Sequence, residues 1–345
     1  MGIIGRHSFE LCSRPRIISS ASYVGDKEGK GPLRECFDKI CRDDTLGLDS
    51  WEQAESRMFE SAVRVALAKI KRQSDDLSCL LGGDLLNQII SSGFAAREIR
   101  APFIGLYGAC STISEGLMLG GMLVDGGFAE LAACAASSHF SAAERQFRYP
   151  LEMGVQAVPS SQRTVTGAGS IIIQAAGEFR PGAGNVFEHV ALTGGTIGSV
   201  EDFGITDANN MGAAMAPAAF ETIKTHLSDY SRRVEDYDRI ITGDLGIFGS
   251  DMLYELLRGE GIEIADRHED CGKLMFSPEQ NVNCGASGCG CAATIMSSWF
   301  LPKIESGEIR RVLFLATGAL MSPVSSLQGE SIPSIAHAVV IEHID

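Results

Sequence analysis

The sequence predicts an α/β fold made of two similar halves. The first observation is that short apolar runs of strand length alternate with longer segments of helical periodicity along the whole chain. This alternation favours sheets that are largely buried and covered by helices. The second observation is an internal repeat with a period of roughly half the chain.

The individual elements follow from these periodicities. Apolar runs of strand length predict strands at Arg16–Ala21, Cys79–Gly82, Phe103–Leu106, Leu131–Ala136, Ser170–Ala175, His189–Thr193, Arg239–Thr242, Arg311–Thr317 and Ala338–His343. Longer periodic segments predict helices at Glu52–Arg72, Thr112–Val124, Met215–Ser228, Ser250–Arg258 and Gly290–Ser306.

The repeat rests on matched elements that occur in the same order. Ser78–Leu85 ends in Gly-Asp-Leu, and Ile240–Leu245 ends in the same three residues. A small-residue turn, an apolar helix and a strand follow in each half, and each half closes with an apolar strand, Gly169–Ile173 or His337–Ile341. The alternative is the general βαβ similarity of any α/β protein, which does not explain the shared order.

Composition and charge narrow the class of function. The chain has 345 residues, of which 45% are hydrophobic and 21% charged, as in globular proteins. Its formal net charge of −15 argues against nucleic acid and anionic lipid as partners, but a local basic pocket for a small anion is still compatible with it. We expect no membrane span and no secretory signal, and therefore ten reduced cysteines in a cytosolic compartment.

Cys110 occupies a predicted strand-to-helix turn, a position that suits a nucleophile. A predicted strand ends near Tyr107, and Gly108–Thr112 then turns into a helix, which puts Cys110 at a helix N-terminus. Unpaired N–H groups and the helix dipole favour the thiolate there, so we expect a lowered pKa, as in a nucleophile elbow. The alternative is a buried thiol that only packs.

Three segments of the sequence resemble the thiolase superfamily, which includes the β-ketoacyl synthases. Gly108–Thr112 resembles the cysteine elbow of the first half, and Val165–Ile171 resembles the Gly-Ala-Gly strand that ends it. Asn283–Gly288 is similar to the second-half turn, with Asn283 where synthases carry a catalytic asparagine. The resemblance implies a thiolase-like fold, with two βαβ halves in a five-layer α-β-α-β-α arrangement.

The same resemblance implies a division of the chain and a quaternary structure. Residues 1–180 would form the N-terminal half, and residues 181–345 the C-terminal half. Proteins of this fold dimerise through an edge of the first-half sheet, so we expect a homodimer.

Two further segments, Thr196–Asp207 and Asn210–Ala219, resemble the stage V sporulation protein AD family more narrowly. That resemblance implies a protein that binds dipicolinic acid (pyridine-2,6-dicarboxylate), or its calcium chelate, for uptake into the developing spore. The implied partners are membrane proteins of the same sporulation assembly. The implied location is peripheral, at the cytoplasmic face of the forespore or spore inner membrane, with a protein that is soluble when isolated.

The chain departs from the catalytic pattern of the superfamily. Condensing enzymes use a histidine, in a Pro-His-Gln-Ala-Asn-like segment, to stabilise the oxyanion and activate the carbon nucleophile. In the matching segment Thr242–Gly246, Gly243 takes the place of that histidine. Val282 stands where thiolases carry a second histidine, and Ala316–Leu320 lacks their second cysteine. Asp244 is open to three interpretations: a base, a neutral carboxyl group that donates a hydrogen bond, or a turn residue.

A dicarboxylate ligand needs N–H or cationic donors. The two helix N-termini, after Cys110 and after Gly285, offer backbone N–H groups. The loop that leaves the first sheet and returns to Gly167 offers His139, Arg145, Arg148 and Arg163. The predicted ligand site comprises Cys110, Ser111, His139, Arg148, Arg163, Gly243, Asp244, Asn283 and Gly285, with Cys110 as the catalytic residue if the protein is an enzyme.

We expect neither a metal site nor a cofactor. Cys284, Cys289 and Cys291 have the spacing C-x4-C-x-C at a predicted helix start, where successive side chains point to different faces.

Three functions are compatible with these residues: a binding protein on a thiolase scaffold, an acyltransferase or condensing enzyme that forms a thioester on Cys110, and a structural subunit with a vestigial pocket. The missing histidines favour the first and the third, and the narrower resemblance favours the first.

Overall fold

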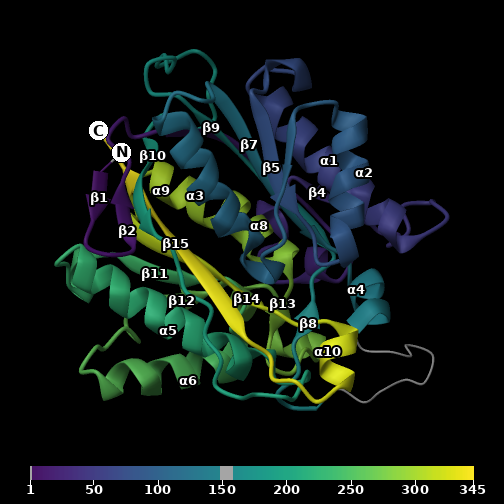
Figure 1. Cartoon of the computed structure of the whole chain (residues 1–345). Coiled ribbons are helices and arrows are strands. Elements are labelled where there is room, and N and C mark those ends of the chain that lie inside the picture. Colours follow the sequence, from purple (N-terminus) through teal and green to yellow (C-terminus); the bar gives the residue numbers. More distant parts are fainter. Residues whose placement is uncertain (1, 148–157) are drawn as a thin grey trace.

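The computed structural model describes residues 2–147 and 158–345 of the chain. Thirteen of its strands form one large sheet, whose main path consists of two five-stranded half-sheets joined by a single residue pair, Arg16 with Ala191; three short strands lie off this path. Helices lie outside each half-sheet and between the two, and the chain termini lie close together (Figure 1). The predicted α/β class is confirmed.

The first half-sheet has two antiparallel strands followed by a parallel edge. β9 pairs antiparallel with both of its neighbours, and the last three strands run parallel. In spatial order the strands are β3 (Arg16–Val24), β9 (Gly167–Gln174), β7 (Leu131–Ser138), β5 (Cys79–Gly83) and β6 (Phe103–Gly105).

The second half-sheet repeats this order and these directions. β15 pairs antiparallel with both of its neighbours, and the last three strands run parallel. In spatial order the strands are β10 (Val190–Thr196), β15 (Ser334–His343), β14 (Arg311–Ala319), β11 (Arg239–Thr242) and β12 (His268–Asp270). The predicted repeat is confirmed, and the predicted division at residues 180 and 181 falls between β9 and β10.

The helices complete five layers. α1 (Trp51–Lys69) and α2 (Ile90–Ile99) cover the first half-sheet, and α5 (Met211–Asp229) and α6 (Gly246–Gly259) cover the second. α3 (Thr112–Asp125) and α8 (Cys289–Ile295) lie between the half-sheets (Figure 1); α3 contacts strands of both half-sheets, and α8 packs on β9, β7 and β3 of the first.

Small residues allow the central helices to approach the strands closely. Every residue of β7 is buried, and six of its eight residues are alanine or serine, Leu131 and Cys134 being the other two. A Cβ atom at Gly169 of β9 would lie 2.3 Å from the backbone carbonyl oxygen of Ala293 in α8. Gly169 is therefore needed for the contact that holds the two elbow turns near each other.

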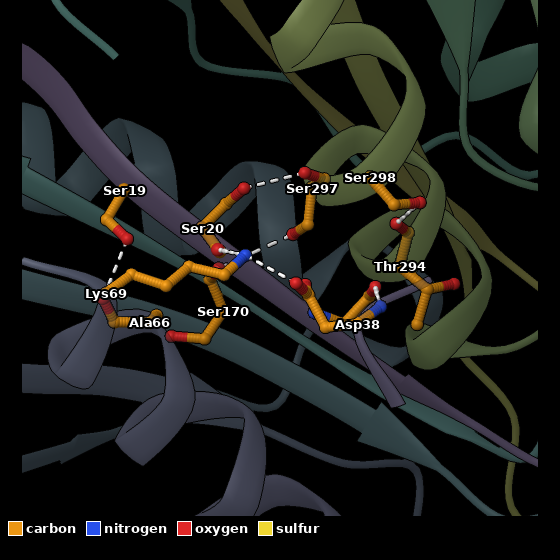
Figure 2. A network of polar contacts seen from close by, with 10 residues as sticks. Ser19, Ser20, Asp38, Ala66, Lys69, Ser170, Thr294, Ser297 and Ser298 are labelled. Carbon is orange, nitrogen blue, oxygen red and sulfur yellow. Dashed lines mark hydrogen bonds and ion pairs between the residues drawn. The ribbon is translucent and has the colours of Figure 1, made fainter. Parts of the chain in front are cut away.

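The predicted helix Gly290–Ser306 is divided in the structure. α8 passes into a π-helical turn, Met296–Phe300, before α9 (Leu301–Glu305). The Ser20 hydroxyl donates to the carbonyl oxygen of Ser297 in this turn, at 2.6 Å (Figure 2). Because a π-turn shifts the helical hydrogen-bond register, an external donor of this kind stabilises it.

The same polar network reaches the surface through Lys69 (Figure 2). The Nζ atom of Lys69 donates to the carbonyl oxygen of Ser20 at 2.8 Å and pairs with Asp38 at 2.6 Å. The network therefore connects α1, β3 and the π-turn across the sheet.

Several short elements were not predicted. α2 contains glycine and two serines, which weaken its helical signal, and the two-residue strands β8 and β13 pair only with each other. The elements absent from the prediction are α2, α4 (Phe140–Phe147), α7 (Cys271–Leu274), α10 (Pro323–Leu327), β1 (Gly2–Ile4), β2 (Ser8–Glu10), β4 (Lys39–Ile40), β8 (Arg163–Thr164), β12 and β13 (Ala286–Ser287).

All ten cysteines are free thiols. Within residues 2–147 and 158–345, no helix combines the length and apolar character that a membrane span requires.

Candidate functional site

A cavity of about 440 Å³ opens where the two halves of the chain meet. Its floor contains Cys110 from the first half and Ser287 from the second, whose Sγ and Oγ atoms lie 3.9 Å apart. The residues that line it are Leu85, Asn87, Tyr107, Ala109, Cys110, Ala143, Glu144, Phe147, Thr164, Met211, Met215, Ser287, Ala319, Leu320, Met321, Ser322 and Ser325.

The Cys110 turn has the strained geometry expected of an elbow. Ala109 adopts a φ of 52°, in the left-handed region that residues with a Cβ atom rarely occupy. The Thr112 hydroxyl donates to the Ala109 carbonyl oxygen at 2.7 Å and holds this turn at the start of α3. The strain places Cys110 at the cavity floor, where its residue surface is 8% exposed.

The protonation state of Cys110 differs from the prediction. Burial raises the pKa of the Cys110 thiol well above its ordinary value, and the Asp244 carboxylate adds to the rise. The predicted lowering of this pKa is wrong, because desolvation and a nearby negative charge outweigh the helix N-terminus. Cys110 is therefore a neutral thiol at physiological pH.

Asp244 organises the turn that faces Cys110. Its Oδ2 accepts hydrogen bonds from the Ser287 hydroxyl at 2.8 Å and from the Gly288 N–H at 2.9 Å, and its Oδ1 accepts from the Thr317 hydroxyl at 3.1 Å. The Cys110 thiol is a further hydrogen-bond partner. Burial raises the pKa of Asp244, whereas these hydrogen bonds favour its ionised form. Asp244 therefore links the two elbows.

Gly243 leaves no room for a catalytic imidazole. A Cβ atom there would lie 2.9 Å from the Cα atom of Ala316 and 3.3 Å from the Cβ atom of Ala292. No histidine lines the cavity among the residues that the structure describes. The group that faces Cys110 from this segment is the Asp244 carboxylate.

His139 is buried outside the cavity lining. Its Nε2 lies 2.7 Å from the carbonyl oxygen of Asp44, and its Nδ1 has no hydrogen-bond partner. Burial lowers the pKa of His139, so its ring is neutral. A neutral ring that is held away from Cys110 does not replace the missing catalytic base.

The remaining predicted residues do not line the cavity, and Arg148 is outside the residues that the structure describes. Ser111 is buried, and its hydroxyl donates a hydrogen bond to the Gly108 carbonyl oxygen. Gly285 has a φ of 113° and its carbonyl oxygen accepts from the backbone N–H of Arg163. The Arg163 guanidinium lies 3.6 Å from the centre of the Phe140 ring.

Asn283 lies at the exposed start of the second elbow. Its Nδ2 donates to the carbonyl oxygen of Val158 at 2.9 Å. Ser287, four residues later, occupies the cavity floor. The internal repeat could have identified Ser287 as a site residue, because Ser287 in the second half corresponds to Cys110 in the first.

Glu144 is a site residue that the sequence did not single out. It is largely buried in the cavity wall, and its Oε1 accepts from the Thr164 hydroxyl at 3.1 Å. It is the one charged side chain among the described residues that line the cavity. Met211 and Met215, which lie one turn apart on α5, could have been found from their spacing.

Comparison with known proteins identifies the family. The family profile described as stage V sporulation protein AD matches residues 5–342. The stage V sporulation protein AD of Bacillus subtilis (strain 168) is 43% identical over 343 residues, which cover 99% of this chain and 98% of that protein. The chain belongs to the stage V sporulation protein AD family.

Solved structures place this family member in the thiolase fold. Human mitochondrial 3-ketoacyl-CoA thiolase superposes with a TM-score of 0.60 at 10% identity, over 98% of this chain and 100% of that one. The 3-oxoacyl-[acyl-carrier-protein] synthase III of Aquifex aeolicus VF5 gives 0.58 at 11% identity, over 95% and 100%. The predicted thiolase-like fold is confirmed, and these low identities bear on the fold alone.

The site of this stage V sporulation protein AD family member is suited to enclosing a small molecule. Thioether, aromatic and aliphatic groups form most of its wall, and hydroxyl groups of Thr164, Ser287, Ser322 and Ser325 supply the polar contacts. A buried thiol that stays neutral is a weaker nucleophile than a thiolate.

Proposed function

We propose that this sporulation protein binds dipicolinic acid, or its calcium chelate, in the cavity at Cys110 without forming a covalent bond. The observation that carries the proposal is the pairing of a neutral Cys110 thiol with Asp244, at a cavity where no described lining residue is a histidine. A cavity of about 440 Å³ has the size of small-ligand sites. Tyr107 and Phe147 are the aromatic side chains of the described lining, and aromatic side chains can stack on a planar ring.

The charge of the wall favours the calcium chelate over the free dianion. Glu144 carries the one negative charge among the described lining residues and would repel a dicarboxylate, and the cation that interacts with it, Arg163, lies outside the lining. Calcium takes six to eight oxygen ligands, more than one dipicolinate supplies, so the Glu144 carboxylate and nearby hydroxyl groups can complete its shell. In the chelate, the Glu144 carboxylate would therefore bind calcium instead of repelling the ligand.

The role implied by the family also suggests where in the cell the protein acts. In this proposal the protein receives the ligand at the cytoplasmic face of the forespore or spore inner membrane. Membrane proteins of the same assembly carry the ligand across. In this proposal the protein is attached to the membrane through those membrane proteins.

A homodimer is part of the same proposal. β6 ends the first half-sheet and pairs only with β5 among the described strands. Ile104 on β6, Tyr107 after it, and Ile90 and Phe94 on α2 are large exposed apolar side chains near this edge. An exposed apolar edge strand is suited to pairing with a second copy across a twofold axis.

Calorimetric titration with dipicolinic acid, with and without calcium, tests the binding function. Saturable binding that calcium strengthens is the expected result. Glu144→Gln should reduce the effect of calcium and improve binding of the free acid, since it removes the repelling charge. Ala319→Phe, which fills the cavity, should abolish binding of both forms.

Matched controls separate the cavity from the rest of the chain. Cys12→Ala, at an exposed cysteine, should leave binding unchanged, whereas Cys110→Ala should alter it. Intact-mass measurement after incubation with acetyl-CoA tests the alternative. A mass gain of one acetyl group that Cys110→Ala prevents would identify an acyltransferase and overturn the proposal. Absence of both binding and mass gain would favour a structural subunit.

A further inference from the structure

The segment between β10 and α5 has a surface that the cavity does not use. It runs beside β15 (Figure 1). Three large apolar side chains point to solvent from it: Ile197 is 46% exposed, Val200 57% and Phe203 53%. Single exposed apolar residues are common, but three within seven residues form a concentration that requires a reason.

The backbone of this segment is held firmly on β15. Glu201 and Ser334 exchange two backbone hydrogen bonds, of 2.9 and 2.7 Å. The N–H of Gly198 donates to the Nδ1 atom of His337 at 3.2 Å, and Ile332 donates to the carbonyl oxygen of Ile205 at 2.7 Å.

These anchoring residues alternate with the exposed ones along the segment. Ile197, Val200 and Phe203 are therefore exposed side chains on a backbone that is anchored at positions between and after them. Binding a partner to a fixed segment has a small ordering cost.

Acidic groups border this apolar surface. Residues 190–223 contain four acids, Glu201, Asp202, Asp207 and Glu221, and neither lysine nor arginine. Lys224, the first base beyond them, is paired with Glu221 at 2.7 Å. Glu201 and Asp202, which lie between Val200 and Phe203 in the sequence, give this apolar surface an acidic border.

The acidic charge beside the apolar side chains decides which kind of partner could bind to this surface. An anionic lipid surface is repelled by the acidic border. A second copy of this chain would bring the same acids, and a net charge of −15, to the contact. A segment with lysine or arginine beside apolar side chains complements both features.

We propose that Ile197, Val200, Phe203 and the acids beside them bind a basic amphipathic segment of another protein. The apolar side chains supply affinity, and Glu201 and Asp202 supply orientation and a faster association rate. The proposal does not depend on which ligand the cavity holds.

Fluorescence anisotropy of the full chain with labelled synthetic peptides tests this proposal. The probe is a peptide of leucine and lysine with helical amphipathic spacing. The first comparison peptide has the same composition in scrambled order, and the second has glutamate in place of lysine. We expect the amphipathic basic peptide to bind about tenfold more tightly than the scrambled one. Added salt should weaken this binding, and the acidic peptide should not bind.

Paired variants locate the site. Val200→Ser combined with Phe203→Ser should weaken the basic peptide about tenfold or more. Ile3→Ser combined with Phe128→Ser changes two even more exposed apolar residues and should have no effect. Both double variants should retain any ligand that the wild-type cavity binds, which separates this surface from the ligand site.

Three results would overturn the proposal. The first is equal affinity for the ordered and scrambled peptides, or no binding of either. The second is equal weakening by the two double variants. The third is sedimentation with phosphatidylcholine vesicles that depends on Val200 and Phe203, because it would assign the surface to a lipid bilayer.

Discussion

Replacing Asp244 by asparagine should make Cys110 more reactive. In the wild type, burial and the Asp244 carboxylate both raise the pKa of Cys110. Asparagine keeps the shape of the side chain and an oxygen for the Gly288 N–H, but removes the charge. Removing a negative charge stabilises the thiolate and lowers the pKa of Cys110 towards its ordinary value.

The size of the effect follows from the direct contact between the Cys110 thiol and the Asp244 carboxylate. Two unit charges about 4 Å apart repel each other by about 4 kcal/mol at an effective dielectric constant near 20. Rearranged hydrogen bonds to Ser287 and Thr317 offset part of this energy. Since about 1.4 kcal/mol corresponds to a factor of ten, we expect Cys110 to be alkylated about ten to a hundred times faster at fixed pH.

Iodoacetamide labelling followed by peptide mass spectrometry measures this rate over a range of pH. The wild-type rate at Cys110 should rise only at alkaline pH, and the Asp244→Asn curve should be shifted to lower pH. Cys12, which is exposed, serves as the reference for reagent activity. Cys289, which is fully buried, reports opening of the fold.

Two results would refute the reasoning. An unchanged labelling rate at Cys110 would mean that the Asp244 charge does not control the thiol. Equal acceleration at Cys110 and Cys289 would mean that the variant loosens the structure instead.

Three further predictions concern stability and assembly. Burial raises the pKa of Glu28 from 4.5 to about 7, so the folded state keeps a proton that the unfolded state releases, and stability falls as pH rises through that window. Glu28→Gln should therefore stabilise the protein at pH 8, by up to about 3 kcal/mol, and not below about pH 4.5, as urea unfolding would measure. Ser20→Ala leaves the buried Ser297 carbonyl oxygen without its side-chain donor and should cost about 1–3 kcal/mol of unfolding free energy. Ile104→Lys places a charge on the β6 edge and should convert a dimer to a monomer in light scattering.

Each of these predictions has a matched control. A stability difference between Glu28→Gln and wild type that does not change with pH would contradict the titration argument. Ser306→Ala removes a similar hydroxyl-to-carbonyl bond at an exposed site and should cost little. Ile3→Lys introduces the same charge elsewhere on the surface, and loss of the dimer in both lysine variants would count against the β6 interface.

The sequence alone determined the architecture of the chain. Strand and helix periods are local properties, so nine strands and five helices could be placed near their observed bounds. The repeat could be recognised because Gly-Asp-Leu and the elbow turns recur in the same order. The position of Cys110 at a helix N-terminus followed from the same local pattern.

Only the tertiary structure decided the chemistry of the site. Whether Cys110 is a thiol or a thiolate depends on burial and on Asp244, which lies 134 positions away in the printed sequence. The opposite placements of Asn283 and Ser287, at the surface and at the cavity floor, arise from packing between the two halves. Burial and electrostatics are sums over neighbours from distant parts of the chain, so a local pattern names candidate residues but does not determine their protonation or their access to a ligand.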